Sequence, residues 1–410
     1  MKRVLVTGLS TYWGGRLAQA LEQRPEVEVI VGVDVDEPSV ELERTEFVKV
    51  GHHHALLRRI VHAAEIDTVL DTRLVVDSSV APPQRAHENN VIGPMNILAA
   101  CGGDGSPVRK FVFKSSAHYY GCEQDDPAFF TEDMPRPHPP RTLLEADIVE
   151  AERAVADFAV RSPQSTVTIL RFANSLGHSL TTSHTRLFSL PAVPVILGFD
   201  PRYQFIHEDD IVGALAHAAG EELPGVYNAA GDGVLVLSEV LDLLDKRGLP
   251  VLPPWGTDTA ASLLGRLPGI DVPAEVRRQL RFGRAIDNRK LKSASFEPRY
   301  TTRETVVEFG RHQRTAHLRQ GDGYVYEGEV EEFLRRSPSV RRRGPSATLG
   351  AGGDDAGVTF DDLGADEVVA VLSSLDEGDL EALHAHESAH QARTAVLAAI
   401  DRRLAETRSS

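Results

Sequence analysis

Two glycines and one aspartate near the N-terminus have the types and spacing of a phosphate-binding turn. Gly8 ends the apolar run Lys2–Thr7, and Gly14 opens a segment with apolar residues at helical spacing. Amides at a helix N-terminus bind phosphate groups, and glycines at these positions allow a tight turn and close packing of the helix on the strand. Asp34 follows Gly14 by 20 residues, where a carboxylate can accept hydrogen bonds from a ribose. The pattern predicts a dinucleotide-binding turn.

Thr11 stands at the position where such a turn has its middle glycine. That glycine lets the backbone approach the phosphates closely. The threonine hydroxyl either contacts the bound nucleotide or crowds it, and both outcomes stay open at this point. We therefore also consider a dinucleotide fold that binds nucleotide weakly or not at all.

Strand-like and helix-like segments alternate through about the first 175 residues. This rhythm is typical of a parallel sheet with helices on both faces, so we predict an α/β fold, a Rossmann-type doubly wound parallel sheet. After Phe172, frequent prolines break the chain into short elements, which predicts a smaller substrate lobe at 176–330. The expected strands are Lys2–Thr7, Val27–Val33, Thr68–Leu70, Lys110–Lys114 and Val167–Phe172, and the expected helices are Gly14–Glu22, Ala55–Ala64, Asn90–Cys101 and Leu143–Val160.

The chain beyond residue 330 differs in composition from the part before it. Residues 331–357 are rich in Arg, Ser, Gly and Pro and have little to bury, which predicts a flexible linker. Residues 358–410 regain helical periodicity and predict a small helical module. A module of this size has a small core, so we expect it to pack on another copy of the chain or on a partner protein whose identity the sequence does not give.

Composition excludes several classes of protein. The formal net charge of −16 disfavours a nucleic-acid binder, and 41% hydrophobic with 25% charged residues is typical of a globular protein. Two cysteines, Cys101 and Cys122, cannot make a disulfide framework, which favours the cytoplasm. Apolar stretches are too short for a membrane span. We expect a cytoplasmic chain without nucleic acid or membrane partners.

Seven blocks of sequence resemble the extended short-chain dehydrogenase/reductase family, in particular its NAD-dependent epimerase/dehydratase branch. They occur in the family's order over about residues 1–330, which is the part we assign to one two-lobed domain, with the dinucleotide-binding region mainly at 1–175. The C-terminal linker and helical module lie outside the resemblance. The blocks are VTGLSTYWGG (6–15), Asp34, NVIGPMNILAAC (90–101), FVFKSSAHYYG (111–121), ILRFANSLG (169–177), FIHEDDIVGAL (205–215) and VYNAAGDG (226–233).

The resemblance implies NAD as cofactor, a nucleotide sugar as substrate, and pairing of two copies into a homodimer through helices such as Asn90–Cys101. Ser116 matches the family's hydroxyl-orienting serine, and Asn174 matches a substrate-binding position. Tyr120 matches a structural Tyr-Gly pair and is not the expected base. The implied cofactor-binding residues are Gly8, Thr11, Tyr12, Trp13, Gly14, Asp34 and Ser115.

The family's catalytic tyrosine and the lysine four residues after it are absent. The chain has seven lysines, and none follows a tyrosine at that spacing. The matching helix, near residues 141–150, contains neither residue type. Glu145, Asp147 and His138 are the nearest candidate acid/base groups, although carboxylates on such a helix usually form its solvated face.

Three functions fit this pattern. The first is a divergent nucleotide-sugar epimerase or dehydratase with replaced acid/base groups. The second is a non-catalytic NAD-binding sensor or scaffold, and the third is a fold kept only for interaction.

Two histidine clusters stand outside the resemblance. His386-Glu387-Ser388-Ala389-His390 matches the H-E-x-x-H zinc signature, but its short C-terminal module offers no substrate cleft. His52-His53-His54 reads as a solvent-facing loop. We predict no metal site.

Overall fold

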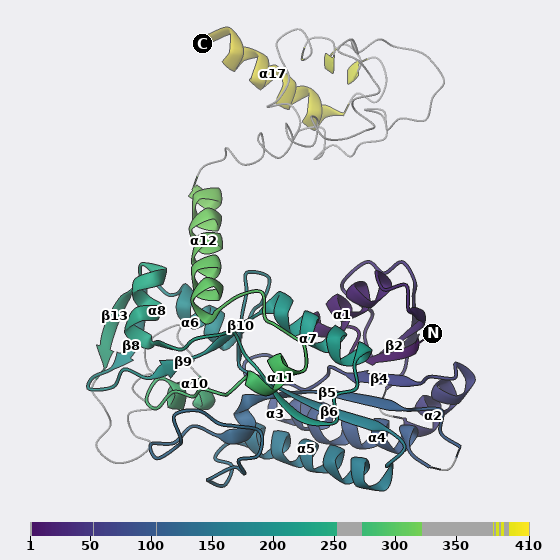
Figure 1. Cartoon of the computed structure of the whole chain (residues 1–410). Helices are drawn as coiled ribbons and strands as arrows, with labels where there is room; N and C mark the ends of the chain where they lie inside the picture. The colour runs from purple at the N-terminus through teal and green to yellow at the C-terminus, as the bar shows by residue number, and fades with distance from the viewer. Residues whose placement is uncertain are drawn as a thin grey trace. The chain divides into compact units, whose positions relative to one another are not determined.

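Seven parallel strands form the central sheet of the described chain (Figure 1). The computed structural model describes residues 2–51, 53–103, 105–251, 273–321, 380, 383–384, 387–388 and 393–409. They fall into two units, Met1–Gly323 and Tyr324–Ser410, which are considered separately. In spatial order the strands are β11 (Gly225–Ala229), β6 (Thr166–Phe172), β5 (Lys110–Ser116), β4 (Thr68–Asp71), β1 (Lys2–Thr7), β2 (Val27–Asp34) and β3 (Thr45–Lys49).

The strand order reverses between β1 and β4. The chain runs outward through β1, β2 and β3, and then returns to β4 on the other side of β1. In an open parallel sheet, ligands bind beyond the carboxyl ends of the strands at such a reversal. The register pairs Thr7 with Asp71, so these two residues stand together at that edge.

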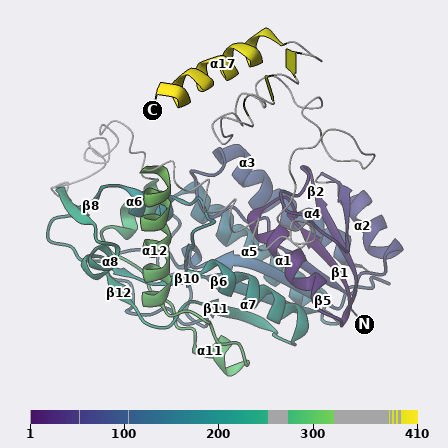
Figure 2. The same ribbon diagram turned by 90° about the horizontal axis from the view of Figure 1, so that it is seen from above.

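Helices cover both faces of the sheet, as Figures 1 and 2 show. One face carries α1 (Tyr12–Glu22) and α7 (Glu208–Gly220), which pack against each other and share one apolar core. The other face carries α2 (His54–Ala63), α4 (Gly93–Cys101) and α5 (Leu143–Arg161) over a second core. The strands β1, β4 and β5 are buried on both faces of the sheet. Their sequences therefore contain consecutive apolar residues instead of an alternation of apolar and polar residues.

The predicted doubly wound α/β fold is confirmed, and most predicted elements agree with the structure to within two residues. The predicted helix at Asn90–Cys101 is the main difference. The chain there first forms α3 (Pro83–His87) and one π-helical turn, η1 (Glu88–Ile92), before α4 begins. The buried Asn90 side chain in that turn accepts the Val75 N–H at 2.7 Å and donates to the Val75 carbonyl at 2.9 Å, so the turn holds the loop that follows β4.

A smaller lobe follows β6. It contains three two-stranded sheets and a third apolar core that includes Tyr203, Phe205 and Phe188. Its strands are β7 (Asn174–Leu176), β8 (Ala192–Ile196), β9 (Arg202–Tyr203), β10 (Phe205–His207), β12 (Leu235–Val236) and β13 (Arg247–Val251). Its helices are α6 (Ser183–Ser189), α8 (Leu237–Leu244), α10 (Ala274–Gln279), α11 (Arg289–Ser293) and α12 (Thr302–Gly321). The first lobe also contains the short 3₁₀ helix η2 (Ala117–Tyr120) directly after β5.

The second unit is described only in part. Its helix α17 (Thr394–Ser409) contributes Val396 and Ile400 to a small buried cluster with Leu380 and Leu383. The predicted linker at 331–357 lies outside the described residues. No helix in the described ranges is long and apolar enough to cross a membrane.

A buried ion pair joins the sheet to α5. The Arg171 guanidinium on β6 donates to both carboxylate oxygens of Glu152, with Nη2 at 2.6 Å from Oε2. Its Cζ lies 3.5 Å from the centre of the Tyr119 ring. Ser115 on β5 also donates to Glu152. These contacts tie two central strands to the helix that covers them.

We expect Glu152→Gln to lower the free energy of unfolding by about 3–5 kcal/mol, because it leaves the buried Arg171 charge without its partner. Urea unfolding followed by circular dichroism measures the change. Glu150→Gln, on an exposed position of the same helix, is the control and should stay within about 0.5 kcal/mol of the wild type. Equal stability of the two variants would contradict this role.

Candidate functional site

The turn between β1 and α1 requires glycine at two positions. Gly8 has a φ of +80°, and a Cβ there would lie 2.5 Å from Cγ of Arg73. A Cβ on Gly14 would lie 2.1 Å from the Gly8 carbonyl oxygen. Both distances are too short for a side chain, so α1 packs against the turn as closely as the sequence predicts.

Thr11 is part of the turn itself. It is the N-cap of α1: its hydroxyl accepts the Gly14 N–H at 3.1 Å and donates to the Gly8 carbonyl at 2.6 Å. A capping side chain satisfies one of the amides that a helix N-terminus otherwise leaves open. The threonine therefore takes up one of the amides that could face a phosphate.

Asp34 lies at the end of β2 and lines a cavity of ≈ 90 Å³ beside the turn. One carboxylate oxygen accepts the Ser10 N–H at 2.9 Å and the Ser10 hydroxyl at 2.5 Å. The other accepts the Val35 N–H at 2.7 Å. The carboxylate is thus oriented by the turn while it faces the cavity.

Two arginines line the same cavity, and neither belongs to a motif that the sequence singled out. Arg73 makes a two-pronged ion pair with Asp71, with Nε at 3.0 Å from Oδ1 and Nη2 at 3.0 Å from Oδ2. Burial alone would raise the pKa of Asp71, but Arg73 and the Thr7 hydroxyl hold this pKa below its usual range. Arg85 is the second arginine. The sequence signal for this cavity is the charged pair of Asp71, which ends the buried strand β4, and Arg73 two residues later.

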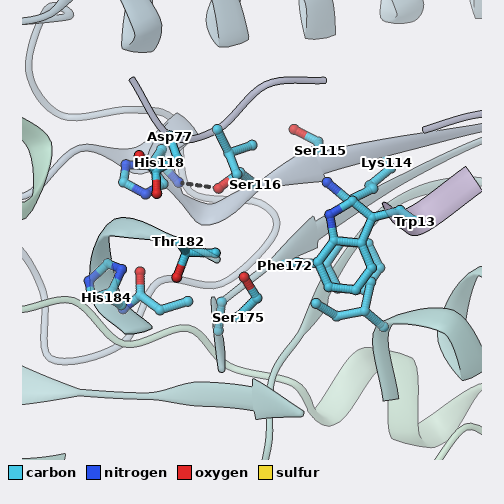
Figure 3. A pocket seen from close by; sticks show the side chains of 14 residues that line it. Trp13, Asp77, Lys114, Ser115, Ser116, His118, Phe172, Ser175, Thr182 and His184 are labelled. Carbon is cyan, nitrogen blue, oxygen red and sulfur yellow. Dashed lines mark hydrogen bonds between the residues drawn. The ribbon is translucent and has the colours of Figure 1, made fainter. Parts of the chain in front are cut away.

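A second cavity, of ≈ 40 Å³, lies at the carboxyl end of β5 (Figure 3). Trp13 comes to it from the first turn of α1, Ser116 from the end of β5, and Asn174 from the start of β7. Ser115, beside Ser116 on β5, also lines the cavity, so the structure brings together four of the predicted site residues. The other lining residues are Val76, Asp77, Lys114, His118, Phe172, Ala173, Ser175, Thr182, His184 and Ile211.

Ser116 and Ser115 have different surroundings although they are neighbours. Ser116 is the N-cap of η2, and its hydroxyl accepts the His118 N–H at 3.2 Å, which Figure 3 marks as a dashed line. Successive side chains of a strand point to opposite faces of the sheet. The Ser115 hydroxyl accordingly donates to Glu152 on α5. Ser116 is thus the serine on the α1 side of the sheet.

The remaining predicted residues have clear partners. The Tyr12 hydroxyl donates to Glu208 at 2.7 Å, and burial followed by this hydrogen bond raises the pKa of Tyr12 well above its usual range. Asn174 accepts from Gln279 at 3.1 Å. Tyr120 is buried and donates to Asn228 at 2.9 Å.

Glu145 and Asp147 do not line the cavity that holds Ser116. The expectation that they form a solvated helix face is wrong, since the two residues are 3% and 6% exposed. Glu145 accepts from Arg136 and from the Arg141 N–H, while Asp147 pairs with His87 at 2.8 Å. His138 pairs with Asp125 at 3.0 Å. These groups are engaged in ion pairs around α5.

Lys114 is the lining residue whose chemistry the sequence motifs do not reveal. It is 3% exposed, and its Nζ lies 5.4 Å from the centre of the Trp13 ring. Burial lowers the pKa of Lys114 to about 8, against the opposing effect of Asp71. In the sequence nothing distinguishes this lysine from the other six, because none of the seven has a tyrosine four residues before it.

Both histidine clusters lie partly outside the described residues. No group of three potential ligands occurs among the residues that the structure describes. His52, His386 and His390 lie outside those residues. Glu387 is buried, and its carboxylate accepts from the Arg393 guanidinium at 2.8 Å.

Residues 4–230 match the model of the NAD dependent epimerase/dehydratase family. The chain is 33% identical to the uncharacterized protein Rv0501 of Mycobacterium tuberculosis over 319 residues, covering 76% of this chain and 84% of that protein. Two solved structures share the fold. UDP-glucose 4-epimerase of Thermotoga maritima with UDP-glucose has a TM-score of 0.58 at 20% identity, covering 77% of this chain and 99% of that one. dTDP-glucose 4,6-dehydratase of Bacillus anthracis with NAD has a TM-score of 0.57 at 18% identity, with 77% and 97% covered.

The chain has a Rossmann-type fold with a tight glycine turn before α1 and a serine-containing cavity. It belongs to the NAD-dependent epimerase/dehydratase family, a branch of the extended short-chain dehydrogenases/reductases. The resemblance seen in the sequence is confirmed.

We expect Thr11→Ala to lower the free energy of unfolding by about 1 kcal/mol, because the N-cap is lost. Thr11→Gly should cost only a few tenths of a kcal/mol, since glycine is accepted at this position. Urea unfolding of both variants measures the difference. Wild-type stability in Thr11→Ala would show that the cap does not contribute.

Proposed function

We propose that this protein is a divergent NAD-dependent epimerase or dehydratase of nucleotide sugars that works without the family's usual tyrosine and lysine. One observation carries the proposal. Trp13, in the first turn of α1, lines the same cavity as Ser116 and Asn174. The phosphate-binding end of α1 and the residues matched to substrate binding therefore belong to one site.

The residues around the turn fit NAD. Gly8 and Gly14 leave the close approach that a pyrophosphate needs, and Asp34 lines the neighbouring cavity as a ribose acceptor would. NAD, when bound, accepts the hydride that leaves a hydroxyl-bearing sugar carbon. Ser116 would orient that hydroxyl, and Asn174 would contact the substrate. The similar fold of the Thermotoga maritima UDP-glucose 4-epimerase, which was solved with UDP-glucose, supports the substrate class.

A non-catalytic NAD-binding sensor or scaffold is the second candidate. The N-terminal turn of α5 favours it, because this turn is occupied by structural contacts. Thr142 caps the helix by accepting the Glu145 N–H at 3.1 Å, and the Glu145 carboxylate is held by Arg136. Neither group is free to act on a substrate, so a conventional base is absent from this segment.

Titration with NAD and NADH, followed by incubation with UDP- and GDP-sugars, separates the two functions. Turnover that Ser116→Ala abolishes supports the enzyme. Binding without turnover supports the sensor or scaffold. If neither cofactor binds at millimolar concentration, both functions are rejected and a role in protein interaction takes their place.

We expect Asp34→Ala to weaken NAD binding by about tenfold and to weaken NADP binding less, because the carboxylate contacts the unmodified ribose. Isothermal titration calorimetry of both cofactors measures the two losses. Glu37→Ala, at an exposed position of the same loop, is the control and should bind NAD as the wild type does. An equal loss for both cofactors would mean that Asp34 does not contact the ribose.

The homodimer implied by the resemblance stays a prediction. Helices α4 and α5 carry large exposed side chains, with Met95 44%, Leu143 73% and Val160 82% exposed. Apolar side chains on neighbouring helices are what a helix-to-helix interface would bury. We expect light scattering to give twice the chain mass of 44.7 kDa, and Val160→Asp to shift the mass toward that of one chain.

A further inference from the structure

Lys114 and Ser116 lie on the same face of β5, because side chains two apart on a strand point to the same side. The core residues around them agree with this alternation. Val112 packs into the core beneath α1 and α7, whereas Phe113 packs into the core beneath α5. Both Lys114 and Ser116 line the cavity at the end of the strand. β6 pairs with β5 at both positions, with Leu170 beside Lys114 and Phe172 beside Ser116, so the two positions are rigidly related.

The Lys114 ammonium is nearly buried yet has no hydrogen-bond or ion-pair partner among the described residues. Lys110, four residues earlier on the same face and equally buried, shows the contrast. Its ammonium donates to the Glu221 carbonyl at 2.6 Å and pairs with Glu222 at 3.2 Å. Burying a charge that has no hydrogen-bond or ion-pair partner is costly, which favours the neutral amine. Lys114 therefore differs from an ordinary structural lysine.

The acids near Lys114 are already bonded to other groups. Asp71 on β4 is held by Arg73 and Thr7. Asp77, which lines the cavity, accepts from the hydroxyls of Ser183 and Ser79, each at 2.6 Å.

The two histidines of the cavity are weak bases. Burial lowers the pKa of His184 to about 4 and holds the pKa of His118 well below its usual range. Both rings are neutral near pH 7 and above. Lys114 is therefore the basic amine that lines the same cavity as Ser116, and Figure 3 shows its side chain beside the Trp13 ring.

We propose that Lys114 is the proton-transfer residue of this site, taking the role for which the family's tyrosine is absent. This inference rests on the proposed function. In the step, the O–H bond of the substrate hydroxyl held by Ser116 breaks, and a new N–H bond forms at Nζ. The amine becomes an ammonium, and the electron pair of the broken O–H bond forms the carbonyl double bond. The C–H bond on the same carbon breaks, and its hydride would pass to bound NAD. The reverse step returns the proton.

The geometry also explains why a lysine can act without a tyrosine. In the family's pair, an ammonium keeps a neighbouring phenol partly ionised. Here the amine itself lines the cavity in which Ser116 would hold the reacting hydroxyl, and its burial makes the uncharged form accessible at moderate pH. A single buried residue then serves as the base, and no second residue is needed to lower its pKa.

The first experiment measures Lys114 directly, without turnover. The chain has only seven lysines, so lysine labelled with ¹³C at Cε gives few NMR signals, and Lys114→Met identifies one of them by its loss. We expect this signal to titrate with a midpoint near 8. We also expect UDP-glucose with NAD to shift it, while the signal of exposed Lys49 stays in place. A midpoint above 10 together with no shift would overturn the proposal.

The second experiment measures turnover of UDP-sugars as a function of pH. Because the base must be unprotonated, kcat/KM of the wild type should rise as pH increases through about 8. Lys114→Met should lose about 10²-fold or more in kcat, while NAD affinity changes less than about threefold. Lys49→Met is the matched control and should retain wild-type kcat.

Lys114→Arg separates proton transfer from charge. An arginine cannot give up its proton, so it should be as inactive as Lys114→Met. If Lys114→Arg restores kcat, the residue only holds an anionic group, and the proposal is wrong. Retained kcat in Lys114→Met also overturns it while leaving the proposed enzyme intact. Absence of turnover by the wild type between pH 6 and 10 rejects both the enzyme and this role.

Discussion

A strand buried on both faces leaves its polar side chains no route to bulk water, and β5 places this constraint at the centre of the protein. Its seven residues are all buried, and two lysines and two serines are among them. Each must find a partner inside the fold or face a cavity. Ser115 is satisfied through Glu152 and Arg171, and Lys110 is satisfied at the end of α7. Lys114 and Ser116 line the cavity. Because successive side chains of β5 point to opposite faces of the sheet, Ser115 supports the fold while its two neighbours belong to the candidate site.

The cofactor turn obeys the same rule in a different way. Thr11 bonds back to the turn that contains it, and Asp34 is oriented by Ser10. Arg73 and Asp71 place a positive and a negative group together at the reversal point of the sheet. The turn therefore keeps the close contact between helix and strand that is typical of a dinucleotide-binding fold. Polar side chains surround this turn, which the spacing of its glycines does not indicate.

Much of the fold could be predicted because its signals are local. A short apolar run followed by Gly8, and a second run ending in Asp34, each define their own element and end. The site was harder to predict because it depends on pairs of residues far apart in sequence. The sequence suggests that Glu145 is a surface carboxylate, but in the structure it pairs with Arg136. Nothing in the sequence separates Lys114 from the other six lysines, but in the structure it lines one cavity with Trp13 and Ser116. A search for a tyrosine four residues before a lysine could not find a lysine on a different element.

The size of the cavity at the end of β5 has a consequence for how a substrate would enter. A volume of ≈ 40 Å³ accommodates a few water molecules and is too small for a sugar ring. Entry of a sugar therefore requires side chains such as Trp13 to move, and the energy of that movement is subtracted from the affinity. Trp13 belongs to the first turn of α1, where the cofactor phosphates would bind. In the proposed function, the nucleotide turn and this cavity would therefore share one indole, and binding at the first would affect entry to the second.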